Sequence, residues 1–238
     1  MLFNYLSQKA IIGQTNGEIS KQRSVIITPQ GTAFSIWGPI FLLQAAFCIY
    51  QALPDSLVKN RNNELIFEKI KYWFAANQIF VVGWIILFSQ NTSLSIFIST
   101  FFMSAFLATA LYMLWISHRN NVNAAEFVTI RVMLSLLAGW VTAATILNIS
   151  IVLKDAGMTG EKTWGWIILI VAFVIYSAFV LIERNFLYGA VFVWVLYWQN
   201  NWSDTQYLLY AYTVALLGYT GLIVANKING NCDRGLLY

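Results

Sequence analysis

The sequence predicts an all-α fold: a polytopic transmembrane bundle of about seven helices. Three observations support this prediction. Only 10% of the 238 residues are charged, whereas soluble domains carry roughly 25%. Hydrophobic residues make up 59% of the chain, and the mean hydropathy is +0.64. The apolar residues also gather in segments of about 20, the length at which a helix crosses the hydrocarbon core of a bilayer.

Seven apolar segments are separated by short polar stretches. The expected spans are residues 32–53, 72–89, 94–117, 126–153, 163–182, 186–198 and 205–225. A charged loop is expected at residues 60–71, between the first two spans. The sixth segment, 186–198, rises only about 20 Å as a helix, against about 30 Å of hydrocarbon. It either crosses with the help of residues 199–202 or forms a re-entrant segment.

Four parts of the chain follow from this pattern. Residues 1–31 form an N-terminal tail, whose apolar and basic mixture suits a membrane surface and faintly resembles a mitochondrial targeting segment. Residues 32–153 hold the first four helices, 154–226 the additional C-terminal helices, and 227–238 a polar tail. Counting Lys and Arg on the two sides, the positive-inside rule places the C-terminus inside.

Charge and aromatic content indicate membrane lipid as a partner and argue against nucleic acid. The net charge is +4, but Lys and Arg lie in tails and loops, where they anchor and orient spans. No basic stripe or nucleic-acid motif accompanies them. Aromatics reach 16%, with ten Trp, a residue that favours the membrane interface.

Chemistry-bearing residues are scarce in the expected spans. No Asp, Glu or Lys lies near the middle of any span, which argues against an ion-coupled pump. Glu126 and Arg131, in the first turns of the fourth span, are expected to reach toward the headgroups. His118 is the only histidine and is expected to be solvated, so a bis-His haem site cannot form. We find no nucleophile motif and no metal-ligand spacing, and expect neither a catalytic nor a metal site.

The first span carries a mixed aromatic and amide face. Its members recur at spacings of three and four and fall within an arc of about 100°. They are Phe34, Trp37, Phe41, Gln44, Cys48 and Gln51. Because an unpartnered amide in hydrocarbon costs several kcal/mol, this face should turn into the bundle. It then forms either a helix–helix hydrogen-bond contact or the wall of an aromatic cavity.

Two further spans repeat the combination of aromatics and an amide. The second span aligns Asn77, Phe80 and Trp84, and the fourth aligns Trp140, Ala144 and Asn148. An apolar pocket with a few polar groups, in which aromatic faces can stack, suits a flat hydrophobic ligand. A well-packed aromatic core fits the same residues equally well.

Two stretches carry a resemblance to a known family. Residues 28–40 read Thr-Pro-Gln-Gly-Thr-Ala-Phe-Ser-Ile-Trp-Gly-Pro-Ile, and residues 139–148 read Gly-Trp-Val-Thr-Ala-Ala-Thr-Ile-Leu-Asn. They resemble the Pro-x-Gly-x-x-Phe lead and the Trp-x-x-x-Ala-x-x-Leu-Asn helix of the TspO/MBR family, the tryptophan-rich sensory and translocator proteins. The match covers roughly residues 28–153, and the remaining spans resemble the longer members of that family.

The resemblance implies a binding role. Members are associated with porphyrin, haem and sterols, and the carried-over pocket residues are Trp140, Ala144 and Asn148, with Trp37, Asn77 and Phe34 beside them. A porphyrin or haem ligand is therefore expected, and no other cofactor. The only indication of an enzymatic activity, porphyrin breakdown, comes from the family resemblance. We expect the protein not to be an enzyme.

A structural role is the alternative that the sequence leaves open. The chain would then be an accessory subunit of a larger membrane complex, in an organelle such as the mitochondrion. Small-residue pairs such as Ala211/Ala215 and Ser104/Ala108 could pack against helices of other subunits or of a second copy in a homodimer. They could equally serve packing inside the bundle.

Overall fold

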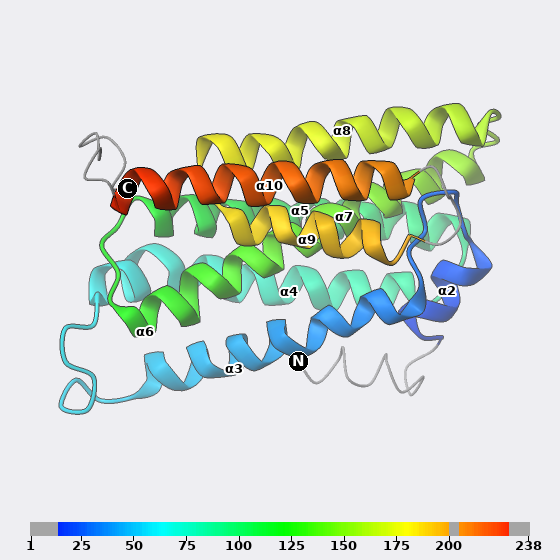
Figure 1. The fold of residues 1–238 in the computed structure, drawn as a ribbon. Coiled ribbons are helices and arrows are strands. Elements are labelled where there is room, and N and C mark those ends of the chain that lie inside the picture. The colour runs from blue at the N-terminus through cyan, green and yellow to red at the C-terminus, as the bar shows by residue number, and fades with distance from the viewer. Residues whose placement is uncertain (1–13, 200–204, 229–238) are drawn as a thin grey trace.

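The computed structural model describes residues 14–199 and 205–228, and in these ranges every regular element is helical. The helices run roughly antiparallel along one axis (Figure 1). In chain order they are α2 (Asn16–Gln22), η1 (Gly31–Ile36), α3 (Trp37–Ala52), η2 (Glu64–Ile70), α4 (Lys71–Phe88), α5 (Ser93–His118), α6 (Ala124–Glu126), η3 (Phe127–Val132), α7 (Met133–Asp155), α8 (Glu161–Ile182), α9 (Phe186–Tyr197) and α10 (Thr205–Ile228).

Six helical segments in the described part are long and apolar enough to span a membrane. They are Gly31–Ala52, Glu64–Phe88, Ser93–His118, Ala124–Asp155, Glu161–Ile182 and Thr205–Ala225. A shorter apolar helix, α9, lies between the last two. The predicted all-α polytopic bundle is thereby confirmed, and the protein is an integral, multi-pass membrane protein. The division of the chain at residue 153 stays a prediction.

The second span begins earlier than the sequence predicts. Instead of a charged loop as far as residue 71, a π-helical stretch starts at Glu64 and continues into α4. Leu65, Ile66 and Ile70 are each at most 1% exposed. Glu64 and Glu68, by contrast, are exposed. The charges thus occupy one face of a helix whose other face packs, and that packing extends the span.

The short helix α9 takes the path of a crossing segment. The helices α8, α9 and α10 alternate in direction (Figure 1). The chain therefore enters α9 at the end of the bundle where α8 finishes and leaves it toward the opposite end. A re-entrant segment would return to the same end. Tyr188 and Phe192 of α9 are 0% and 1% exposed. Because neighbouring helices cover much of this helix, its 12 residues need not match the full bilayer thickness.

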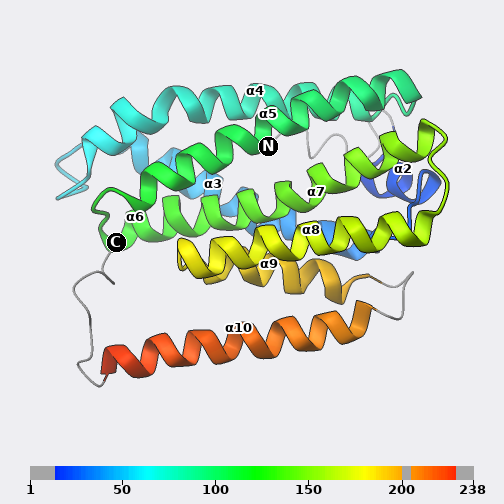
Figure 2. The ribbon, with the colours of Figure 1, turned by 90° about the horizontal axis from the view of Figure 1, so that it is seen from above.

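The helix α7 lies at the centre of the bundle and positions the candidate site. The apolar part of the span 124–155, which contains α7, is 61% buried. The corresponding part of α10 is only 6% buried, and α10 lies at one edge of the bundle (Figure 2). Gly139 lets α9 approach α7 closely. A Cβ at this position would lie 3.0 Å from the Cβ of Val191.

One of the two charged residues at the start of the fourth span, Glu126, does not reach toward the headgroups, contrary to the sequence prediction. The carboxylate of Glu126, 1% exposed, accepts hydrogen bonds from the Asn62 N–H at 2.6 Å, the Asn123 N–H at 3.0 Å and the Tyr50 hydroxyl at 3.2 Å. A buried carboxylate requires such partners. The charge therefore ties three segments together.

Arg131 is the second of these charges. Its guanidinium donates to the Ser117 carbonyl at 3.0 Å and to the Asn120 carbonyl at 2.7 Å. The last carbonyls of a helix lack partners within the helix, and Arg131 supplies one at the end of α5. Its guanidinium therefore reaches the polar end of the span, in line with the sequence prediction, and caps α5 there.

The prediction of a solvated loop position for His118 is also wrong. It is the last residue of α5, and its side chain is 15% exposed. Its Nδ1 lies 3.4 Å from the Oε2 atom of Glu183, the residue that follows α8. The Glu183 side chain lies against the ring and leaves it little exposed.

Candidate ligand-binding site

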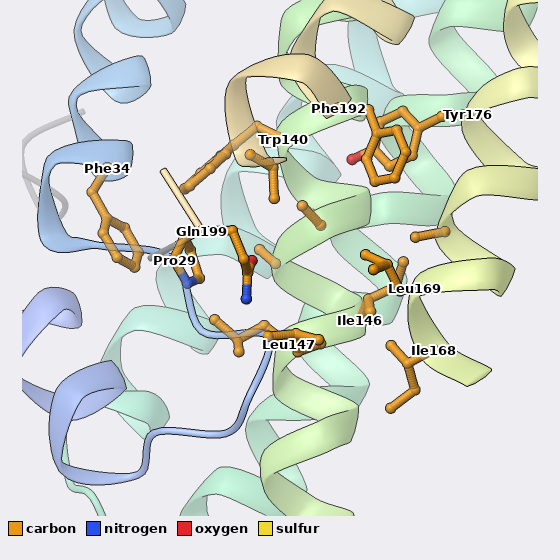
Figure 3. A pocket seen from close by; sticks show the side chains of 15 residues that line it. Pro29, Phe34, Trp140, Ile146, Leu147, Ile168, Leu169, Tyr176, Phe192 and Gln199 are labelled. Carbon is orange, nitrogen blue, oxygen red and sulfur yellow. The ribbon is translucent and has the colours of Figure 1, made fainter. Parts of the chain in front are cut away.

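A small cavity lies beside Trp140, where α7 meets α8, α9 and the segment 23–30, which we call the strap (Figure 3). Its volume is about 50 Å³. Three of the six predicted site residues line it: Phe34, Trp140 and Ala144. The lining is almost entirely apolar, and the side chains in it that carry polar atoms are those of Trp140, Tyr176 and Gln199.

A cluster of aromatic rings forms the α7 side of the site. The rings of Phe34 and Trp140 meet edge to face at 5.5 Å, and those of Trp37 and Trp140 do so at 6.3 Å. Phe34 belongs to η1, a 3₁₀ stretch, in which side chains three residues apart lie above one another. Phe34 and Trp37 therefore reach the same indole.

The buried face of α3 differs from the predicted one in its second half. Trp37 and Gln44 are buried as expected, but Phe47 is buried where Cys48 was expected, and Cys48 is partly exposed. The ring of Phe47 packs on Phe74 of α4 with centroids 5.0 Å apart. The buried positions in this half of the helix are therefore Phe47 and Tyr50 instead of Cys48 and Gln51.

The two predicted asparagines contact α5. The Asn77 amide donates to the Phe106 carbonyl at 2.9 Å and to Thr109 Oγ1 at 2.8 Å. The Asn148 amide donates to Ser99 Oγ at 3.1 Å and to Thr100 Oγ1 at 3.3 Å. Neither side chain lines the cavity. They form interhelical hydrogen bonds, and a role for either of them in ligand binding stays a prediction.

Three buried polar atoms near the aromatic cluster have no hydrogen-bond partner in the described part of the chain. They are Nε1 of Trp37, Nε1 of Trp140 and Oε1 of Gln44. The three residues are 4%, 3% and 2% exposed. Since about nine in ten buried polar groups are hydrogen-bonded, such atoms are open to a partner that the chain itself does not supply.

The C-terminal helices supply the part of the lining that the sequence did not reveal. The hydroxyl of Tyr176 on α8 donates to the Gly139 carbonyl at 2.6 Å, and its ring stacks on Phe192 of α9 at 4.6 Å. No motif marks these residues in the sequence. Pro29 also lines the cavity, and it lies in the stretch 28–40 that carries the family resemblance.

Polar bonds hold the strap over the cavity. At its start, Arg23 forms an ion pair with Asp155 at the end of α7. In the middle, the Ile26 carbonyl accepts a hydrogen bond from Nε2 of Gln199 at 2.9 Å. At its end, the Gln30 N–H donates to the Trp198 carbonyl at 2.9 Å. Each of these partners lies at a helix end, so the strap closes the cavity at one end of the bundle.

The comparison with known families finds a match to the family described as TSPO-like protein, over residues 1–225. The chain belongs to this family. Neither a curated protein nor a solved structure matches the chain. The TSPO-like match extends past residues 28–153, where the sequence resemblance lies, and takes in α8 and α9. The helices that complete the cavity are therefore part of the TSPO-like region.

Proposed function

We propose that this TSPO-like membrane protein binds a flat hydrophobic ligand, a tetrapyrrole or a sterol-like molecule, beside Trp140. The observation that carries this proposal is the contact of Trp140 with Phe34 and Trp37 next to the cavity. Aromatic edges and faces suit a planar apolar ligand. The unpartnered indole N–H groups of Trp37 and Trp140 could donate to its polar substituents.

The volume of the cavity requires an opening step. Ligand pockets commonly enclose about 300–1,000 Å³, whereas this cavity has about 50 Å³. Opening at the strap would break the polar bonds of Arg23, Ile26 and Gln30. It would also lift Val25 and Ile27, which are 6% and 9% exposed, out of the core. Water can replace the polar bonds at the end of the bundle, where the strap lies.

Among the tetrapyrroles, the lining suits metal-free protoporphyrin better than haem. The described lining residues include no His, Cys or Met, and the hydroxyl of their one tyrosine, Tyr176, already donates to the Gly139 carbonyl. Trp140 and Phe34 would hold the macrocycle by ring contacts. Gln199 and the strap lie where the polar edge of a porphyrin would meet the headgroup region.

The test is a protoporphyrin IX titration of the detergent-solubilised protein, followed through Trp quenching and the porphyrin absorbance shift. We expect saturable binding at micromolar concentrations. Trp140→Leu should weaken it about tenfold, the equivalent of roughly 1.4 kcal/mol. Trp73→Leu is the matched control, because Trp73 is 43% exposed on α4 and packs on Tyr112. A flat titration of well-folded protein would contradict the proposal.

A second candidate function is that of an accessory subunit in a larger, mitochondrial membrane complex. The outward face of α10 favours it, with Val214, Leu217 and Leu222 between 63% and 70% exposed. Purification from native mitochondrial membranes in mild detergent distinguishes the two functions. A subunit would co-purify with other chains at fixed stoichiometry, and a ligand-binding protein would elute alone.

A further inference from the structure

A second hollow lies on the outside of the bundle, between the last turns of α5 and α8. This α5–α8 groove has a volume of about 370 Å³, far larger than the cavity beside Trp140. Its walls are apolar, with Leu111 and Leu114 on α5 and Phe179 and Ile182 on α8. Both helices are candidate membrane spans, so these walls lie at the depth of lipid chains.

A pair of opposite charges closes the groove where the two spans end. The carboxylate of Glu183 lies 3.4 Å from His118 Nδ1 and 3.4 Å from a terminal nitrogen of Arg119. Charge-assisted hydrogen bonds are usually about 2.7–2.9 Å long, so both contacts are loose. The side chains of Glu183 and Arg119 are 23% and 45% exposed. A carboxylate accepts about four hydrogen bonds and a guanidinium donates five, so both groups have capacity for a ligand.

Aromatic side chains mark the depth of this end of the groove. Trp115 and Tyr112 line it, are 48% and 40% exposed, and stack at 6.2 Å. The Arg119 guanidinium lies over the Trp115 ring, 4.4 Å from its centroid. Exposed Trp and Tyr side chains on spanning helices favour the membrane–water interface. The charged end therefore lies at headgroup level and the apolar walls extend toward the membrane core.

We propose that the α5–α8 groove is a binding site for one zwitterionic phospholipid with a primary ammonium, that is, a phosphoethanolamine headgroup. An acyl chain lies between Leu114 and Phe179, the phosphate accepts hydrogen bonds from Arg119, and the ammonium donates to Glu183. The adjacent guanidinium of Arg119 and carboxylate of Glu183 match the adjacent phosphate and ammonium of this headgroup in charge and in hydrogen bonding.

The same charges select against other headgroups. An anionic lipid such as phosphatidylglycerol has no cation to pair with Glu183, so no charge offsets the repulsion between its phosphate and that carboxylate. The quaternary ammonium of phosphatidylcholine keeps the charge but has no N–H to donate. This site lies apart from Trp140 and shares no lining residue with the cavity there, so it does not rest on the proposed function.

Native mass spectrometry of the full-length protein tests the proposal. The protein is released from nanodiscs that contain equal amounts of phosphatidylethanolamine, phosphatidylcholine and phosphatidylglycerol. We expect one retained lipid, with phosphatidylethanolamine favoured about fivefold over each of the others. Equal retention of the three would mean bulk lipid only, and a preference for phosphatidylglycerol would mean an anionic site. Either result, or no retained lipid, overturns the proposal.

Variants separate the two halves of the headgroup. Glu183→Gln should abolish the preference for phosphatidylethanolamine over phosphatidylcholine, whereas Arg119→Ala should reduce retention of both. Glu68→Gln is the matched control, since Glu68 is an exposed acid on another helix. Because Glu183 also links α8 to α5, Ala178→Leu provides a variant that keeps every charge and fills the groove. If Ala178→Leu still retains the lipid with the same preference, the groove is not the site.

Discussion

Phe34 and Trp140 meet edge to face, with ring centroids 5.5 Å apart and ring planes at 84°. One ring belongs to the 3₁₀ stretch that precedes α3 and the other to the middle of α7. The contact places the lead of the first span against the central helix of the bundle. It also forms one side of the cavity that the strap closes.

Asn148 joins α7 to α5 in the structure, so its removal should affect stability more than ligand affinity. Asn148→Leu removes the hydrogen bonds to Ser99 and Thr100 and should destabilise the α5–α7 contact by about 1 kcal/mol. The protoporphyrin Kd should change less than about twofold, because the side chain lies outside the cavity lining. Thermal unfolding in detergent and the titration measure the two effects. A large rise in Kd with unchanged stability would show that the amide contacts ligand.

Loosening the strap should speed ligand binding. Arg23→Ala removes the ion pair with Asp155 and the hydrogen bonds to Asn91. We expect the association rate of protoporphyrin to rise about three- to tenfold, as a loss of about 1 kcal/mol from the closed state implies. Stopped-flow quenching measures this rate. Lys21→Ala, at an exposed position on α2, is the control and should leave it unchanged. An unchanged rate in Arg23→Ala would place ligand access elsewhere.

The packing of α9 against α8 should depend on Gly189. A Cβ at this position would lie 2.5 Å from Cγ2 of Val180 and 3.2 Å from Cδ1 of Leu216. Gly189→Ala should therefore destabilise the protein by about 1–3 kcal/mol. Adding Val180→Ala should recover part of that loss in a double-mutant cycle. Gly218→Ala serves as control, because nothing lies within 4 Å of its added Cβ. Additive effects at 189 and 180 would contradict the close contact between these two helices.

Glu126 should be among the more costly polar residues to remove. Glu126→Ala leaves the Asn62 and Asn123 N–H groups and the Tyr50 hydroxyl without their acceptor. We expect a loss of about 1–3 kcal/mol in unfolding free energy, since buried donors then lack partners. Unfolding in mixed micelles measures it against Glu68→Ala, which removes an exposed acid. Equal stability of the two variants would show that water replaces the carboxylate.

The lining of the cavity was predictable from the sequence only in part. Three of its residues, Trp140, Ala144 and Phe34, were named from the sequence because their spacing and the family resemblance both depend on residues near one another in the chain. Asn77 was predicted beside them through the family resemblance. Which partner it takes is a matter of neighbouring helices, and the structure gives it α5.

The sequence by itself determined the spans and the family, because the length of an apolar run and a local motif need no knowledge of distant residues. Only the tertiary structure decided the rest: the start of the second span at Glu64, the strap over the cavity, and the position of His118 beside Glu183. Each depends on how segments distant in the chain pack against one another. Moving the buried face of a helix by one residue turns that face by about 100°, and only the complete packing of the bundle decides which face is buried.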